Sequence, residues 1–197
     1  VGPELVVVTG GYAGAPAGIV AALSGIPLVL QEQNSVPGVV TRVLSRVARR
    51  VHVAFPEAIE RLPERARSRA VVSGNPIRPP ATMDAGEARE ALGLDPELPV
   101  VLVVGGSQGS AALNRAMADA LRERSRWEGP PAYQVLWSTG PRHEADVRAE
   151  MEALGGPAGV RVTGYIDAMP TALAAATVAV SRAGAMATSE FLALGLP

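Results

Sequence analysis

Eight short apolar runs, separated by longer mixed segments, most strongly constrain how this 197-residue chain can fold. The runs are about as long as a β-strand, and most of them are rich in valine and apolar at consecutive positions. Continuous apolar runs are typical of strands covered on both faces, whereas strands with one solvent face alternate apolar and polar residues. The runs are Leu5–Thr9, Pro27–Gln31, Arg50–Ala54, Ala70–Ser73, Val100–Val104, Tyr133–Ser138, Val160–Thr163 and Thr177–Ser181.

The segments between the runs are mostly long enough for helices. Alternating strands and helices indicate a doubly wound α/β fold with parallel sheets. Asp84 and Glu87 form a capping-box pattern, and Gly93 stands where that helix would end. Helices are predicted over Ala15–Ser24, Val39–Val47, Pro56–Leu62, Asp84–Leu92, Ser110–Arg124, Arg142–Leu154, Met169–Ala174 and Met186–Leu194.

Three prolines between Asn75 and Thr82 interrupt any regular element, so we place a domain boundary near residue 80. Residues 1–80 are then expected to be the second half of one sheet domain, and residues 81–197 the first half of another. The chain opens without Met, leads directly into the apolar run from Leu5 to Val8, and stops at Gly195-Leu196-Pro197. We interpret both ends as cuts in a longer sequence.

Composition excludes several function classes. A formal charge of −1 argues against an overall nucleic-acid binder, which needs an excess of Lys and Arg. Without cysteine there is no disulfide framework, thiolate metal site or cysteine nucleophile, which fits a cytoplasmic setting. No run approaches the roughly 20 apolar residues that cross a bilayer.

The segment from Gly105 to Ser110 is a Gly-rich turn between a buried strand and a helix. Such a turn lets the backbone approach a ligand, and the following helix N-terminus offers unpaired N–H groups to a phosphate. The spacing matches neither G-x-G-x-x-G nor a P-loop. Phosphate binding and an ordinary tight turn therefore stay equally open from this motif alone.

A second junction of this kind runs from Ser181 to Glu190. Its small residues clear space, and Glu190 could accept hydrogen bonds from both hydroxyls of a ribose. Taken alone, Glu190 is better explained as a solvent-facing helical residue.

A third Gly-rich turn, from Thr9 to Pro16, also follows a strand, and Gln31 to Asn34 lies at the end of the next. Arg78 adds a cation near the expected boundary, suited to bidentate phosphate binding. Ligands of open α/β sheets bind at the carboxyl ends of the strands. Three such turns together favour a binding site over three ordinary loops.

In this order, the motifs GGYAGAP, QEQN, GNPIR, GGSQGS, YIDAM and SRAGAMATSE closely resemble the MurG family of GT-B glycosyltransferases. The match runs over essentially the whole chain. The resemblance implies two Rossmann-like domains, each only partly present. It further implies that the C-terminal domain holds UDP-N-acetylglucosamine and that the N-terminal domain meets an undecaprenyl-linked muramyl-pentapeptide.

The resemblance also implies roles for individual residues. Ser107 would contact the donor near its diphosphate, Ile166 would line the uracil slot, and Glu190 would bind the ribose. Gly10, Gly11 and Tyr12 would receive the acceptor diphosphate, with Glu32 nearby. The other implied donor contacts are Asn34, Arg78, Ala185, Met186, Ala187, Thr188 and Ser189.

The implied reaction is attack of the acceptor sugar's 4-hydroxyl on the donor's anomeric carbon, with inversion and loss of UDP. The resemblance implies no metal and no cofactor. Glu32 is a candidate base by its chemistry, because the His-containing loop usual in the family is absent from this sequence. His52 and His143 are better explained as structural, and the chain alone is expected to bind UDP weakly and to transfer no sugar.

A basic stretch contains Arg42, Arg46 and Arg50, which would share one face of a continuous helix. Val40, Val43, Leu44 and Val47 would then gather on another face as a core stripe. The basic face is either simply solvated or attracted to anionic lipid headgroups. Because a lipid-linked acceptor brings the enzyme to the membrane, we favour the second reading, with a peripheral location on the cytoplasmic face of the bacterial plasma membrane.

Two alternatives of related chemistry stay open: another lipid-directed GT-B enzyme, such as a diacylglycerol glycosyltransferase, and a UDP-N-acetylglucosamine 2-epimerase. The epimerase would share fold and donor but use no lipid acceptor. A third alternative is a non-catalytic nucleotide-sugar module.

Overall fold

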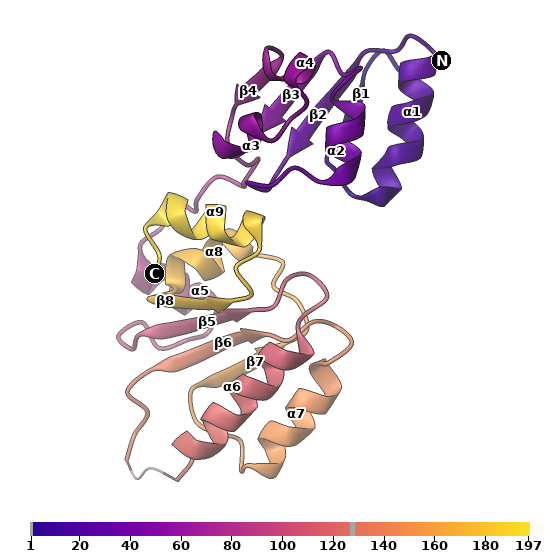
Figure 1. Ribbon diagram of the computed structural model, residues 1–197. Helices are drawn as coiled ribbons and strands as arrows, with labels where there is room; N and C mark the ends of the chain where they lie inside the picture. Colours follow the sequence, from indigo (N-terminus) through magenta and orange to yellow (C-terminus); the bar gives the residue numbers. More distant parts are fainter. Residues whose placement is uncertain (1, 127–128) are drawn as a thin grey trace. The chain divides into compact units, whose positions relative to one another are not determined.

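The computed structural model describes residues 2–126 and 129–197 (Figure 1). The chain divides into two compact units, Val1–Pro76 and Ile77–Pro197. The division lies at Pro76, inside the proline-containing segment that interrupts regular structure in the sequence. Each unit is organised around its own parallel sheet.

In the first unit, the strands lie side by side in chain order: β1 (Val6–Val8), β2 (Leu28–Glu32), β3 (Arg50–Val53) and β4 (Ala70–Val72). Every crossover therefore steps in the same direction. Because parallel crossovers are right-handed, all the connecting helices fall on one face of this sheet. They are η1 (Tyr12–Gly14), α1 (Ala15–Leu23), α2 (Val39–Leu44), α3 (Glu57–Glu60) and α4 (Glu64–Arg67).

The core of the first unit lies under those helices. Leu30 and Val53 point into it and pack with Leu44 of α2. On the opposite face, Val7 is 57% exposed and Val71 is 39% exposed. Among the described residues, the expectation of strands covered on both faces therefore fails for this unit, because the sequential strand order sends every helix to one side.

In the second unit, the strands are β5 (Val100–Val104), β6 (Gln134–Ser138), β7 (Val160–Thr163) and β8 (Val178–Ser181), in the order β7-β6-β5-β8. Helices α6 (Ala111–Arg124) and α7 (Glu144–Ala153) cover one face (Figure 1). The other face is covered by α5 (Ala85–Ala91), α8 (Met169–Ala175) and α9 (Ala185–Leu194). This sheet is doubly wound, as the sequence predicts.

The order of the second sheet reverses at β5. The chain moves from β5 to β6 and β7, then returns to place β8 on the other side of β5. Connections leave the reversal point toward opposite faces, which opens a crevice at the carboxyl ends of the strands. The turns after β5 and β8 both lie at this crevice edge.

The sequence locates all eight strands and most helices correctly, but the helix predicted over Val39–Val47 stops at Leu44. The guanidinium of Arg69 explains the stop. It donates hydrogen bonds to the carbonyls of Ser45, Arg46, Ala48 and Arg65 at 2.8–3.2 Å. The bonds to Ser45, Arg46 and Ala48 satisfy carbonyls that a longer helix would use internally, so the chain turns away after α2.

Two local predictions are confirmed at α5. The Asp84 side chain accepts a hydrogen bond from the Glu87 amide, and the Glu87 carboxylate accepts one from the Asp84 amide. Gly93 follows the helix with a φ of +65°.

The short helix α4 was not predicted. Among the described residues, no helix is both long and apolar enough to cross a membrane.

Candidate functional site

The turn from Gly105 to Gly109 follows β5 and leads into α6. Gly106 and Gly109 have φ values of +88° and +73°, which glycine adopts readily and other residues rarely do. The Gly109 amide donates to the Gly106 carbonyl at 2.9 Å, and the Ser110 side chain caps α6. The result is a closed turn beside a helix N-terminus, an arrangement that suits an anion.

A second turn follows β8 and leads into α9. The Ser181 hydroxyl accepts a hydrogen bond from the Ala183 amide at 3.1 Å, and Ala183 has a φ of +53°. Arg182 Nε donates to the Gly105 carbonyl at 3.0 Å. Arg182 therefore ties the two turns together at the point where the strand order reverses.

A cavity of about 300 Å³ opens beside these turns. It brings together Arg78, Ser107, Met186, Ala187 and Glu190, all of which the sequence analysis assigned to the donor. The remaining lining residues, which the sequence analysis did not assign, are Val104, Gly106, Ser138, Tyr165, Met169 and Phe191. Tyr165, Met169 and Phe191 give part of the lining an aromatic and apolar character.

Other residues assigned to the donor lie close by in the chain. Ile166 is 6% exposed and packs in the core, whereas its neighbour Tyr165 lines the cavity. Ala185, Thr188 and Ser189 belong to the first half of α9, the helix that carries Glu190. Their contacts with a donor stay predictions.

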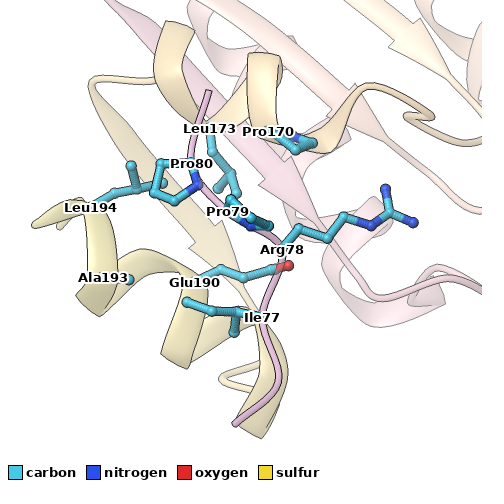
Figure 2. A pocket seen from close by; sticks show the side chains of 9 residues that line it. All are labelled: Ile77, Arg78, Pro79, Pro80, Pro170, Leu173, Glu190, Ala193 and Leu194. Carbon is cyan, nitrogen blue, oxygen red and sulfur yellow. The ribbon is translucent and has the colours of Figure 1, made fainter. Parts of the chain in front are cut away.

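Glu190 lines this cavity and carries a carboxyl group of perturbed acidity. Partial burial raises the pKa of its carboxyl above the ordinary value of 4.5, and the positive charge of Arg78 partly offsets that rise. Figure 2 shows a narrower hollow next to the cavity, where the Glu190 side chain points from α9 toward the segment Ile77–Pro80. A carboxylate and a guanidinium thus share one wall of the second unit.

The first unit carries its own cavity, of about 250 Å³, at the carboxyl ends of β1 and β2. Gly10, Gly11 and Tyr12, the residues assigned to the acceptor, line it together with Glu32. Asn34, which was assigned to the donor, lines this cavity and not the one in the second unit, so its contact with the donor stays a prediction. Gly10 and Gly11 have φ values of +86° and +72°, and Tyr12 is 83% exposed. The further lining residues are Thr9, Gln33, Gly38, Val39, Val40 and Thr41.

Glu32 is only 4% exposed, and its carboxylate accepts three hydrogen bonds from its own loop. One oxygen accepts from the backbone amide and the side-chain amide of Asn34, both at 3.1 Å. The other accepts from the Gly38 amide at 3.0 Å. This geometry suits a residue that shapes the loop better than one that moves a proton.

The two histidines lie in structural settings. His52 belongs to β3, and its Nδ1 lies 3.2 Å from the Ser73 hydroxyl. His143 stands at the start of α7. Within residues 2–126 and 129–197, no cluster of three or more His, Asp or Glu side chains could hold a metal ion.

The predicted basic helix face is wrong. Arg42 lies on α2, Arg46 lies in the turn after it, and Arg50 begins β3, because Arg69 ends the helix at Leu44. The predicted core stripe is also wrong for two members, since Val43 and Val47 are 50% and 58% exposed. A groove of about 420 Å³ is lined instead by Val39, Arg42, Val43, Arg46, Glu60, Arg61, Leu62, Pro63 and Arg67.

Comparison with known families decides the classification. The sequence model of the glycosyltransferase family 28 N-terminal domain matches residues 1–53, and that of the C-terminal domain matches residues 100–197. The chain belongs to glycosyltransferase family 28. The first cavity lies in the part of this family 28 chain matched by the N-terminal model. Apart from Arg78, the residues lining the donor-side cavity lie in the part matched by the C-terminal model.

Individual relatives of this family 28 chain agree with the MurG resemblance. It is 43% identical, over 99% of its length, to the UDP-N-acetylglucosamine--N-acetylmuramyl-(pentapeptide) pyrophosphoryl-undecaprenol N-acetylglucosamine transferase of Salinibacter ruber, of which it covers 50%. It is 30% identical to the solved MurG of Acinetobacter baumannii, with a TM-score of 0.61 over 95% of this chain and 49% of that one. The chain therefore spans about half the length of the curated relatives it matches.

The fold is shared more widely than the sequence. A UDP-GlcNAc 2-epimerase of Neisseria meningitidis, solved with UDP-GlcNAc, is 12% identical, with a TM-score of 0.58 over 92% of this chain and 54% of that one. At that identity the likeness concerns the fold alone.

Proposed function

We propose that this chain carries donor-binding and acceptor-binding surfaces of an inverting glycosyltransferase. The enzyme moves N-acetylglucosamine from UDP-N-acetylglucosamine to the 4-hydroxyl of an undecaprenyl-linked N-acetylmuramyl-pentapeptide, a step of peptidoglycan synthesis. The observation that carries the proposal is the cavity at the reversal point of the second sheet, where Arg78, Ser107 and Glu190 line one space.

In the donor site, each part of UDP meets a matching surface. The uracil enters the slot formed by Tyr165, Met169 and Phe191, near Ile166. The Glu190 carboxylate accepts hydrogen bonds from the ribose hydroxyls. The Gly105–Gly109 turn, Ser107 and the N-terminus of α9 from Ala185 to Ser189 face the diphosphate.

Departure of UDP builds negative charge on the diphosphate. The Arg78 guanidinium and the oriented amides of the Gly-rich turn stabilise that charge without rearranging during the reaction. Preorganised donors of this kind typically change rates by factors of about 10² to 10³ each.

In the acceptor site, the left-handed turn at Gly10 and Gly11 exposes backbone beside Tyr12, where the acceptor diphosphate binds. Asn34 lines the same cavity, and we propose that it contacts the substrates. We assign Glu32 to holding Asn34 and the loop to Gly38, because its carboxylate already accepts three hydrogen bonds.

A chimera tests the proposal directly. This chain replaces the matching half of the Salinibacter ruber relative, and the product is assayed with labelled UDP-N-acetylglucosamine and the lipid acceptor. We expect lipid-linked disaccharide, and loss of at least about 100-fold in rate with Glu190→Ala. Release of free N-acetylmannosamine without an acceptor would instead support the epimerase reading.

We also propose that the first unit meets the cytoplasmic face of the bacterial plasma membrane through the groove beside α2. Exposed Val39 and Val43 lie next to Arg42 and Arg46 there. Apolar side chains insert at the headgroup level, and each nearby cation adds about 1 kcal/mol of attraction to anionic lipid.

Vesicle binding tests the membrane contact. The double variant Arg42→Gln, Arg46→Gln is expected to lose roughly tenfold or more in affinity for anionic vesicles. Arg50→Gln is the matched control, because Arg50 lies on β3 and not on the groove. Equal binding by the double variant and the control would contradict the proposal.

A further inference from the structure

Asn114 is a polar side chain in an otherwise apolar part of the second unit. It lies in the first turn of α6, where its backbone N–H donates to the Ser110 carbonyl at 2.8 Å. The residue is only 5% exposed. Trp137, Ala118 and Leu121 form the buried cluster on this side of the sheet. A buried amide in such a place requires partners, because an unpaired one is destabilising.

Both ends of the Asn114 carboxamide have a partner. Its Nδ2 donates to the Thr139 carbonyl at 2.8 Å, and its Oδ1 accepts from the Trp137 indole N–H at 3.1 Å. Trp137 and Thr139 lie at and just after the end of β6. The bond from Trp137 also fixes which way the carboxamide faces, so that its N–H groups point toward Thr139.

The Thr139 carbonyl is in turn the surface on which the Gly105–Gly109 turn rests. A Cβ on Gly109 would lie only 1.8 Å from the Thr139 oxygen. A Cβ on Gly140 would lie 2.3 Å from the Gln108 oxygen. Two peptide segments therefore stack directly on one another, and any shift of Thr139 shifts the Gly-rich turn.

We infer that Asn114 is a positioning residue that fixes the Gly105–Gly109 turn, and through it Ser107, by clamping the Thr139 carbonyl. This inference rests on the proposed donor site. Asn114 lies behind the turn and does not line the cavity. Its loss should weaken recognition of the diphosphate and leave recognition of the nucleoside intact, because Tyr165, Phe191 and Glu190 come from other elements.

The test compares UDP with uridine on the 197-residue chain. Asn114→Asp keeps the shape of the side chain but replaces the N–H groups that face Thr139 with a carboxylate oxygen. We expect affinity for UDP to fall about tenfold while affinity for uridine changes less than about twofold, measured by calorimetry and NMR titration. Trp137→Phe, which adds no charge, should produce a smaller loss in the same direction.

Hydrogen exchange supplies a readout that needs no ligand. In both variants the amides of residues 106–109 should exchange faster, whereas those in the C-terminal half of α6 should not. Leu121→Ala is the matched control, since Leu121 is buried on the same helix but far from the turn along the chain. It should lower stability without changing the ratio of UDP to uridine affinity.

The inference is overturned if UDP and uridine lose affinity in equal proportion, or if exchange at residues 106–109 is unchanged in both folded variants. A parent chain that binds neither ligand would count against the proposed donor site instead. The exchange measurement would then still decide whether Asn114 positions the turn.

Discussion

The Glu32 carboxylate receives two hydrogen bonds from Asn34, one from its backbone amide and one from its side-chain amide. A third bond, from Gly38, closes the loop on the same carboxylate. The pair links a buried strand end to a residue assigned to substrate contact. The position and orientation of the Asn34 side chain therefore depend on the buried Glu32 carboxylate.

Replacing Glu32 with Ala should destabilise the fold. The amides of Asn34 and Gly38 would lose their partner, which costs about 1–3 kcal/mol in free energy of unfolding. Urea denaturation measures the loss, with exposed Glu57→Ala as the control. A Glu32→Ala chain as stable as the control would argue that Glu32 has a chemical role and no structural one.

Glu190→Gln should change stability and UDP binding in opposite directions, with a small gain in stability and a loss of affinity for UDP. The raised pKa of the Glu190 carboxyl means that the folded state holds the proton more tightly than the unfolded state does. The carboxylate is therefore slightly destabilising at neutral pH, and this effect fades as pH falls through the folded pKa toward 4.5.

Thermal unfolding across pH measures this effect. At pH 7 the Gln variant should melt higher by no more than about 2 °C, and the two melting temperatures should converge below pH 4.5. The same variant should bind UDP more weakly. A variant less stable than its parent at pH 7 would show that the attraction to Arg78 outweighs burial.

Gly140→Ala should be among the most damaging glycine substitutions in the second unit. Its φ is +90°, and a Cβ there would meet the Gln108 carbonyl at 2.3 Å. Steric overlap with backbone adds roughly 1–3 kcal/mol to the cost of the left-handed conformation.

Gly155→Ala is the control for Gly140→Ala in denaturant titrations. Gly155 has a φ of +82° with nothing within 4 Å of an added Cβ, so only the backbone contribution, about 1–2 kcal/mol, should appear. Equal losses of stability at Gly140 and Gly155 would mean that the segment at Gly140 does not press on the Gly105–Gly109 turn.

Arg69→Met should loosen the end of α2. Carbonyls of Ser45, Arg46, Ala48 and Arg65 would lose a charged donor, and each such bond contributes about 1.5–3 kcal/mol when it is not replaced by water. We expect a net loss nearer the lower figure, because the Arg46 and Arg65 contacts are exposed.

Chemical denaturation of Arg69→Met is compared with Arg65→Met, a neighbouring exposed arginine. The control should stay within about 0.5 kcal/mol of the parent. Two indistinguishable curves would leave the early end of α2 unexplained by Arg69.

Strand positions were predictable because short, valine-rich apolar runs are typical of strands in parallel sheets. The cavity of the first unit was predictable as well, since Gly10, Gly11, Glu32 and Asn34 follow two strands that lie side by side. Adjacent parallel strands end at the same edge, which makes sequence order a guide to spatial neighbourhood.

The misses share a physical origin in long-range contacts. Nothing near α2 reveals that Arg69, more than twenty positions away, will end the helix. Likewise, Tyr165, Met169 and Phe191 have the character of core residues, and only the reversal of strand order directs them to a cavity. Apolar ligand contacts cannot be told from packing contacts by residue type.

Among the described residues, helices cover only one face of the first sheet, and this affects how copies of the chain interact in solution. Within the part of the chain that the structure describes, Val7 and Val71 are exposed apolar side chains on the opposite face, and β1 pairs with β2 alone. At high concentration, copies of the chain should associate through the uncovered face of the first sheet or through its edge at β1. We therefore expect the tendency of the chain to associate to grow with its concentration.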